Sequence, residues 1–259
     1  MTEIMHLTRN GHILEMRLDR PKANAIDSST SREMGKAFNE FRDDPELWVA
    51  ILTGTGKFFS AGWDLKAAAA GTEGDGNDHG ENGFGGIVNN YTLNKPVIAA
   101  VNGYAAGGGF EIALACDMIV ASTNASFMLS EVNVGVMATG GGIIELPKRI
   151  PWGIANEMLY TGRPMNSSEA LKYGLICRES DPNELMDSAR ALADDIVTSA
   201  PLSVQAVKSI LRDVEGLPRK EAFKAQERNP EHEKALKSED FKEGPRAFSE
   251  KRKPRWQAK

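Results

Sequence analysis

The sequence has few of the residues used for disulfide, metal and histidine chemistry, with two cysteines and four histidines among 259 residues. The cysteines, Cys116 and Cys177, stand far apart, so we expect neither a disulfide framework nor a metal site. No apolar run approaches the roughly 20 residues that a membrane-spanning helix needs. The first residues include an acid and lack the apolar stretch of a signal peptide, so we expect a cytoplasmic protein with no membrane partner.

An excess of basic residues is also missing, because 31 Lys and Arg face 36 Asp and Glu and leave a net charge of −5. Proteins dedicated to duplex binding usually show a basic footprint, so no nucleic-acid partner is expected. Residues 240–259 reverse this balance and have a net charge of +4. That tail is either a solvated chain end or a segment that contacts an anion.

Glycine, in contrast, is abundant: 25 residues, or about one in ten, against a usual ~7%. Thirteen of them fall in three clusters, at 71–86, 107–109 and 140–142. The first cluster has no Lys or Arg and is typical of a mobile surface loop or a substrate lid. The hydrophobic share of 41% and charged share of 26% indicate a globular protein rather than a disordered or fibrous one.

Short apolar segments alternate with helical patterns over the first 150 residues, which is typical of an α/β fold. Expected strands are 13–18, 48–53, 96–101, 117–121 and 126–129, with helices after Asp27-Ser28 and at 110–115. After about residue 180 the pattern is helical. A helix start is predicted at 181–184, another helix is marked by Val204, Val207 and Leu211, and a further helix starts at Pro218 and ends at Pro230. We therefore predict a core at 1–195 and a helical region at 196–259.

The glycine triplet 107–109 precedes a helix, where backbone N–H groups lack partners and the helix dipole is positive. Two such groups can form an oxyanion hole for an enolate. Phosphate binding is a weaker alternative because the Lys-Ser/Thr of a P-loop is missing, and tight packing is a third.

Two carboxylates stand in apolar surroundings, Glu111 in FEIALA and Glu131 between FML and VNVGV. Burial raises the pKa of a carboxyl group, which suits general acid–base catalysis. Glu111 is alternatively an acid that the helix dipole favours. The histidines lie in the N-terminal segment, the glycine loop and a polar helix, so a catalytic histidine is not expected.

The segments LDRPKANAID, FFSAGWDL, KPVIAAVNGYAAGGGFEIALACD, NASF..SE and SED..EGPRAF.EKRKP resemble the crotonase (enoyl-CoA hydratase/isomerase) family almost from end to end. The resemblance implies a spiral of ββα units, as in ClpP-like folds, with C-terminal helices that assemble a homotrimer or a dimer of trimers. It implies an enzyme that adds or removes water across the α,β double bond of an enoyl-CoA thioester.

The family's functional residues fall on matching positions of this sequence. The resemblance implies oxyanion-hole amides at Trp63 and Gly108 and catalytic carboxylates at Glu111 and Glu131. The coenzyme A part would lie along Lys22, Ala23, Ala25, Ala61, Asp64 and Leu65, with the basic tail as a further contact for its phosphates. Coenzyme A enters as part of the acyl-CoA substrate, so no separate cofactor and no metal are expected.

Further matches, including NEM..TGR.M and SAPL, resemble the subgroup that dehydrates carnitinyl-CoA. Recognition of its quaternary ammonium would use aromatic faces, for which the candidates are Trp63, Phe84, Tyr91 and Tyr104, together with acids of the loop 71–86. The sequence departs from the subgroup at Ala106, Ser130 and 137–140. The alternatives are a general enoyl-CoA hydratase or isomerase of fatty-acid oxidation, and a non-catalytic binding protein of the same fold.

Overall fold

The computed structural model describes residues 4–65 and 78–259. Its largest sheet has the strand order β1-β2-β4-β7-β9-β12, in which only β1 and β2 pair antiparallel. These strands are Met5–Asn10, Ile13–Leu18, Val49–Gly54, Val97–Val101, Met118–Ser122 and Arg178–Ser180. A smaller sheet has the order β11-β10-β8-β5, formed by Met165–Asn166, Ser126–Met128, Tyr104–Ala106 and Phe58–Ser60.

The chain repeats one path, from a strand of the large sheet to a strand of the small sheet and then to a helix. β7 leads to β8 and to α3 (Gly108–Ala115), and β9 leads to β10, η2 (Glu131–Val134) and α4 (Gly142–Arg149). Parallel strands need such crossovers. This repeat is the predicted spiral of ββα units, and the expected α/β class is confirmed.

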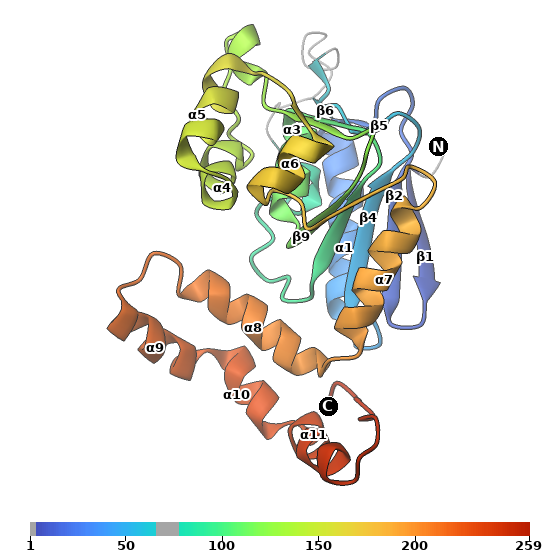
Figure 1. The fold of residues 1–259 in the computed structure, drawn as a ribbon, viewed down its shortest axis with the longest axis vertical. Coiled ribbons are helices and arrows are strands. Elements are labelled where there is room, and N and C mark those ends of the chain that lie inside the picture. The colour runs from blue at the N-terminus through green and yellow to red at the C-terminus, as the bar shows by residue number, and fades with distance from the viewer. Residues whose placement is uncertain (1–3, 66–77) are drawn as a thin grey trace.

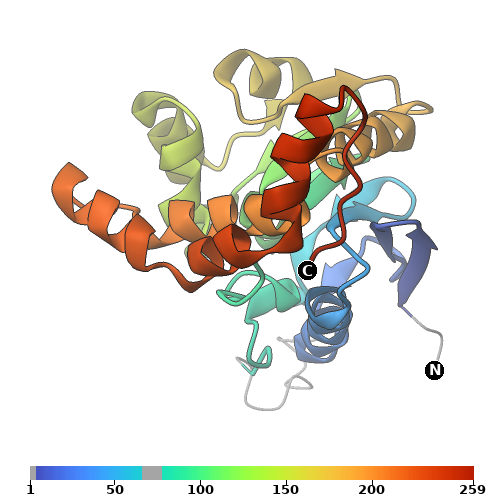
Figure 2. The ribbon, with the colours of Figure 1, turned by 90° about the horizontal axis from the view of Figure 1, so that it is seen from below.

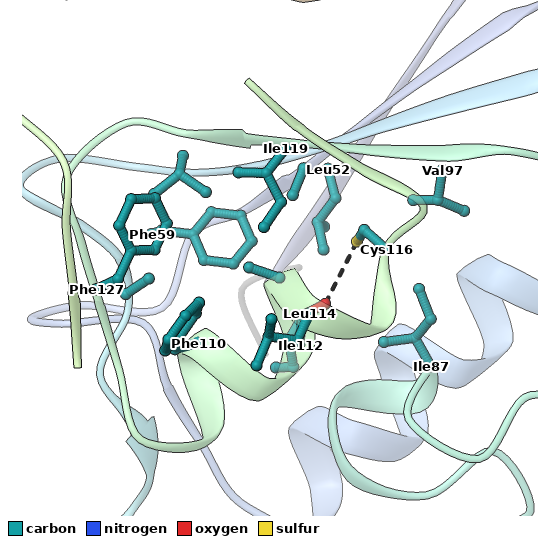
Figure 3. Close-up of a cluster of buried hydrophobic side chains, with 14 of the residues drawn as sticks. Leu52, Phe59, Ile87, Val97, Phe110, Ile112, Leu114, Cys116, Ile119 and Phe127 are labelled. Atoms are coloured by element: carbon teal, nitrogen blue, oxygen red, sulfur yellow. Dashed lines mark hydrogen bonds between the residues drawn. The ribbon is translucent and has the colours of Figure 1, made fainter. Parts of the chain in front are cut away.

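Both faces of the large sheet are covered, which explains why its strands read as continuous apolar runs. On one face, Ala50 and Leu52 pack with α1 (Ser28–Asp43) and α3 in the main core. On the other face, Val49 and Ile51 pack against α7 (Leu185–Val197). Figure 3 shows part of the main core, where buried Cys116 donates a weak hydrogen bond to the Ile112 carbonyl and packs as a small apolar residue.

The start of α1 follows the sequence prediction. Asp27 is the N-cap residue, and its side chain accepts a hydrogen bond from the amide of Thr30. The predicted apolar face is buried and consists of Met34, Ala37, Phe38 and Phe41. Helix α7 begins at Leu185, slightly after the predicted start. The residues before it form a turn, in which the carboxylate of Asp181 accepts a hydrogen bond from the amide of Asn183.

The C-terminal helices form a separate layer below the core (Figure 1), and Figure 2 shows the same layer from below. They are α8 (Pro201–Asp213), α9 (Arg219–Arg228), α10 (Pro230–Lys237) and α11 (Glu239–Ser249). Pro230 does more than end α9, since it begins α10 with Asn229 as N-cap. The division expected at 195/196 stays a prediction; α7 continues across it to Val197.

The helix predicted from Val204, Val207 and Leu211 is present as α8. Leu202 and Ala206 are the residues that pack against Ala235 of α10. Val207 and Leu211 are instead 57% and 65% exposed. Helical spacing thus predicted the helix, but it did not show which face of the helix packs against the rest of the chain.

Helices α5 (Trp152–Thr161) and α6 (Ser167–Tyr173) follow α4 in the chain, with strand β11 between them. Strands β3 (Ala25–Ile26) and β6 (Gly62–Trp63) form a separate parallel pair. This small pair is the part of the fold that positions the candidate site.

Candidate active site

The strand β6 brings Trp63 beside the first residue of α3. Gly62 has a φ of +77°, and a Cβ atom built on it would lie 2.5 Å from the backbone nitrogen of Gly108. Glycine is therefore required there for both backbone conformation and close approach. The peptide before Trp63 thus packs against the N-terminus of α3, where the Gly108 N–H has no carbonyl four residues earlier in the helix. The backbone of β6 and the first amide of α3 are therefore in close contact.

The rest of the glycine triplet is explained by close packing. A Cβ atom on Gly108 would lie 2.4 Å from Cε1 of Phe84, and one on Gly109 would lie 2.1 Å from the carbonyl oxygen of Ser60. Gly107 has a φ of +54° and precedes the helix as its N-cap. Tight packing and amide presentation, which the sequence left as alternatives, occur together at this triplet.

Two buried polar residues that the sequence analysis did not single out hold β6 in place. The hydroxyl of Ser60 donates to the carbonyl oxygen of Asn24 at 2.7 Å and accepts from the amide of Gly62 at 3.0 Å. Asn24 is 2% exposed, has a φ of 51°, and donates from Nδ2 to the carbonyl of Phe58 at 2.8 Å. Asn24 lies in LDRPKANAID and Ser60 in FFSAGWDL, so their only signal in the sequence was the resemblance of these segments to the family.

Glu111 lies on α3 with 5% of its surface exposed. Its Oε1 accepts a hydrogen bond of 2.9 Å from the amide of Gly142, the first residue of α4. A Cβ atom on Gly140 would lie 2.5 Å from its Oε2. Burial raises the pKa of Glu111 to about 7, to which the nearby Glu131 contributes, while the Gly142 and Gly140 amides oppose the shift. The second glycine run thus holds this carboxylate.

Glu131 begins η2 and lies over the N-cap of α3, since its Oε1 is 3.2 Å from a Cβ atom built on Gly107. Its Oε2 is buried and has no hydrogen-bond partner among the described residues. Burial raises the pKa of this carboxyl group as well. An unpartnered buried carboxylate oxygen is costly for stability and is typical of a reacting group.

Both carboxylates, Gly108 and Trp63 line one cavity of about 640 Å³. The structure thus brings together all four residues predicted for the oxyanion hole and for proton transfer. Their roles stay predictions. The remaining lining residues come mainly from 78–89 and 135–140: Asp78, His79, Gly80, Gly83, Phe84, Val88, Asn89, Gly135, Val136, Met137, Thr139 and Gly140.

The residues predicted to contact coenzyme A gather around the β3–β6 pair. Ala25 pairs with Gly62, and the amide of Ala61 donates to the carbonyl of Ala23 at 2.9 Å. Lys22 is exposed and Leu65 is 52% exposed. The remaining candidate, Asp64, forms an ion pair within the chain.

The carboxylate of Asp64 accepts a hydrogen bond of 2.9 Å from Arg20, which also pairs with Asp27 at 2.7 Å. This arrangement ties β6 to the N-terminus of α1. Arg20 was not singled out from the sequence. We interpret Asp64 as a residue that holds the β3–β6 pair, beside any contact it makes with substrate.

The aromatic candidates divide among three places. Trp63 and Phe84 line the cavity, whereas Tyr91 lines a second cavity that extends to α8, and Tyr104 packs on Phe58 with ring centroids 5.3 Å apart. In the loop 71–86, residues 71–77 lie outside the described part of the chain, and several of 78–84 line the cavity.

The departures from the subgroup pattern lie near this cavity. Ser130 has a φ of −99°, which a proline ring does not adopt, and Met137, Thr139 and Gly140 line the cavity. In the basic tail, Arg252 forms ion pairs with Glu243 and Glu250. Part of the tail's charge is therefore neutralised within the chain.

Within residues 4–65 and 78–259, no group of three or more His, Cys, Asp and Glu side chains is arranged to hold a metal ion. In the same ranges, the helices are too short or too polar to cross a bilayer.

Comparison with known proteins gives one consistent family. Residues 8–259 match the family described as enoyl-CoA hydratase/isomerase. The carnitinyl-CoA dehydratase of Proteus mirabilis (strain HI4320) is 55% identical over 262 residues, with all of both chains covered. The solved enoyl-CoA hydratase of Mycobacterium tuberculosis H37Rv is 39% identical with a TM-score of 0.92, covering 99% of this chain and 100% of that one. The solved carnitinyl-CoA hydratase of Mycobacterium avium is 40% identical with a TM-score of 0.77, covering both chains in full.

The family match covers nearly the whole chain, and the relatives match from end to end with the same fold. The chain therefore belongs to the crotonase family of enoyl-CoA hydratases and isomerases and is a lyase of the enoyl-CoA hydratase type.

Proposed function

We propose that Glu111 and Glu131 interconvert an enoyl-CoA and its 3-hydroxyacyl-CoA, with the amides of Trp63 and Gly108 binding the thioester oxygen. The observation that supports this assignment is that both carboxylates line one cavity with the first amide of α3. Coenzyme A enters as part of the substrate, and the reaction needs no other cofactor.

In the hydration direction, Glu111 accepts a proton from water as the water oxygen bonds to Cβ. The electron pair of the double bond moves toward the thioester, and negative charge grows on its oxygen between the two amides. Glu131 then donates its proton to Cα, which completes the 3-hydroxyacyl thioester. Dehydration reverses each transfer, so the pair holds one proton in either direction.

Fixed amides aimed at a developing oxyanion stabilise the transition state more than the ground state, because they need no reorganisation. Removal of one such donor costs ~10²–10³ in kcat at comparable acyl sites. The packing of Gly62 against Gly108 is what keeps the two peptides together.

We further propose crotonobetainyl-CoA and carnitinyl-CoA as the substrate pair. Relatives at 55% identity are named carnitinyl-CoA dehydratase. The cavity supports this choice, because its walls include the rings of Trp63 and Phe84 and the carboxylates of Asp78, Glu111 and Glu131. Aromatic faces and carboxylates attract a trimethylammonium group.

The experiment compares wild type, Glu111→Gln and Glu131→Gln on crotonobetainyl-CoA and crotonyl-CoA. We expect each variant to lose ~10²–10⁴ in kcat while it still binds the thioester in calorimetry, because each removes one proton-transfer group. We also expect wild type to prefer crotonobetainyl-CoA. Near-normal rates in both variants would contradict the catalytic assignment.

The same assays separate the alternatives. Equal or reversed preference would identify a general enoyl-CoA hydratase of fatty-acid oxidation, and double-bond migration without water addition would identify an isomerase. Thioester binding with no reaction in wild type would identify a non-catalytic binding protein.

The proposal includes a homotrimer or a dimer of trimers in the cytoplasm. The assembly is supported by large apolar side chains on the C-terminal helices that the chain leaves exposed, namely Val207, Leu211, Phe223, Leu236, Phe241 and Phe248. Large apolar side chains that one chain leaves exposed can be covered by a second copy of the chain. Light scattering coupled to gel filtration measures the assembly, and a monomer would contradict it.

A further inference from the structure

Arg149, the last residue of α4, is hydrogen-bonded to the end of α3. Its Nη2 donates to the carbonyl oxygens of Leu114 and Cys116, at 2.6 Å each. Leu114 lies in the last turn of α3, and Cys116 is its C-cap residue (Figure 3). The last carbonyls of a helix have no partner within the helix, and a cation is favourable at that end. Arg149 therefore caps α3 from α4.

The opposite end of α4 contacts α3 as well. There the amide of Gly142 donates to Oε1 of Glu111 at 2.9 Å. Gly142 and Arg149 are the first and last residues of the same eight-residue helix. The two helices are thus hydrogen-bonded at two points, one of which is the proposed catalytic carboxylate.

The position of α4 along α3 depends on these two points. Leu146 is the one buried side chain of α4, and it packs in the main core. Apolar burial is non-directional, so it holds α4 against the core without setting its register along α3. The helix's own bonding is interrupted at Pro147, because its nitrogen cannot donate to the carbonyl of Ile143. The register therefore follows from the hydrogen bonds at the two ends.

We propose that Arg149 is a positioning residue for Glu111: by capping α3 from the last turn of α4, it sets the place of the Gly142 amide and so the aim of the carboxylate. This inference rests on the proposed function, since Glu111 is the group that it positions. The guanidinium acts through α4 and takes no part in proton transfer.

The first measurement compares the steady-state kinetics of wild type, Arg149→Met and Arg149→Lys. Methionine keeps a long side chain but cannot donate, so we expect kcat to fall about tenfold with little change in KM. One nitrogen makes both bonds in wild type, and the ammonium group of lysine can also donate more than once. Arg149→Lys should therefore restore kcat to within about threefold of wild type.

The second measurement follows the protonation of Glu111 without turnover. Infrared spectra of the free enzyme between pH 5 and 9 report the C=O stretch of protonated carboxyl groups, and the part that Glu111→Gln removes belongs to Glu111. A hydrogen bond to the ionised form lowers the pKa of a carboxyl group. Loss of the Gly142 bond in Arg149→Met should therefore raise the pKa of Glu111 above its value of about 7, by roughly one pH unit. Glu131 is unchanged in these variants, so its contribution to this pKa is common to both.

Lys148→Met is the matched control. It removes a cation from the same turn of α4, but Lys148 is exposed and pairs with Glu145 and Glu215. We expect this variant to keep the kcat and the infrared titration of wild type. Equal losses in Lys148→Met and Arg149→Met would show a general effect of charge and overturn the inference.

A lower melting temperature in Arg149→Met, with unchanged kcat and an unchanged infrared titration, would show a purely structural role and also overturn it. So would the lack of any carboxyl band that Glu111→Gln removes. If wild type does not hydrate the thioester, or if Glu111→Gln reacts at a near-normal rate, the proposed function fails. The infrared comparison of wild type and Arg149→Met still decides the positioning of Glu111 in that case.

Discussion

The amide of Gly142 donates a hydrogen bond of 2.9 Å to Oε1 of Glu111, and this bond joins the N-terminus of α4 to the middle of α3. It makes the glycine run 140–142 part of the site. A carboxylate that is 5% exposed would otherwise have little to orient it. Burial raises the pKa of Glu111 to about 7, and the backbone amides of Gly142 and Gly140 oppose this rise.

The first prediction concerns Gly140. The Gly140→Ala change should lower kcat by about 10² with little change in KM, because the added Cβ atom would lie 2.5 Å from Oε2 of Glu111 and displace the carboxylate. Steady-state kinetics measure this split. Gly153→Ala is the matched control: a Cβ atom there meets nothing within 4 Å, so kinetics should be unchanged. Equal kinetics in the two variants would refute the positioning role of Gly140.

The second prediction is a bell-shaped dependence of kcat/KM on pH. The active pair holds one proton, and its loss from the free enzyme should produce a falling limb near pH 7, where Glu111 titrates. A second proton binds as the pH decreases and gives the rising limb. Initial rates between pH 5 and 9 provide the profile, and a constant kcat/KM from pH 6 to 9 would exclude Glu111 as the titrating group.

The third prediction is that the ionised carboxylate of Glu111 lowers the free energy of unfolding at neutral pH. Folding raises the pKa of Glu111 from 4.5 to about 7, so the folded state binds more protons between these values. Stability from this group is complete below about pH 4.5 and falls as the pH increases through 7. Gln is neutral throughout and keeps an acceptor for the Gly142 amide.

Relative to wild type, Glu111→Gln should therefore gain up to about 3 kcal/mol in unfolding free energy between pH 4.5 and 8. Urea denaturation at pH 5, 6 and 8, at one protein concentration, measures the gain. A stability difference independent of pH would show that the carboxylate ionises as freely in the folded state as in the unfolded one.

The fourth prediction concerns Ser60. Ser60→Ala leaves the Asn24 carbonyl and the Gly62 amide without their partner, which costs roughly 1–3 kcal/mol for each buried group. Because Gly62 precedes Trp63, kcat should also fall, by about tenfold, while the carboxylate pair stays in place. Thermal unfolding and kinetics test both effects. Ser203 is exposed on α8, so Ser203→Ala should change neither, and parallel behaviour of the two variants would refute the role of Ser60.

Local pattern determined much of the fold. The apolar face of α1, its cap at Asp27 and the buried strands β4 and β7 lie where the sequence predicted them, because side-chain periodicity and capping act over a few residues. The apolar setting of Glu111 predicted a buried carboxylate, and the structure confirms the burial. The family resemblance predicted which residues would meet at one site.

Contacts between distant segments were decided only by the tertiary structure. Nothing near residue 140 in the sequence indicated that its glycines hold Glu111, and nothing near residue 79 indicated the contact with Ser31. The exposed stripe of Val207 and Leu211 shows the same limit, because helical spacing cannot tell a face covered by this chain from one left for a partner. Sequence by itself determined the elements and the type of chemistry. The tertiary structure decided the aim of each carboxylate, because that depends on amides and side chains brought together from elements far apart in the chain.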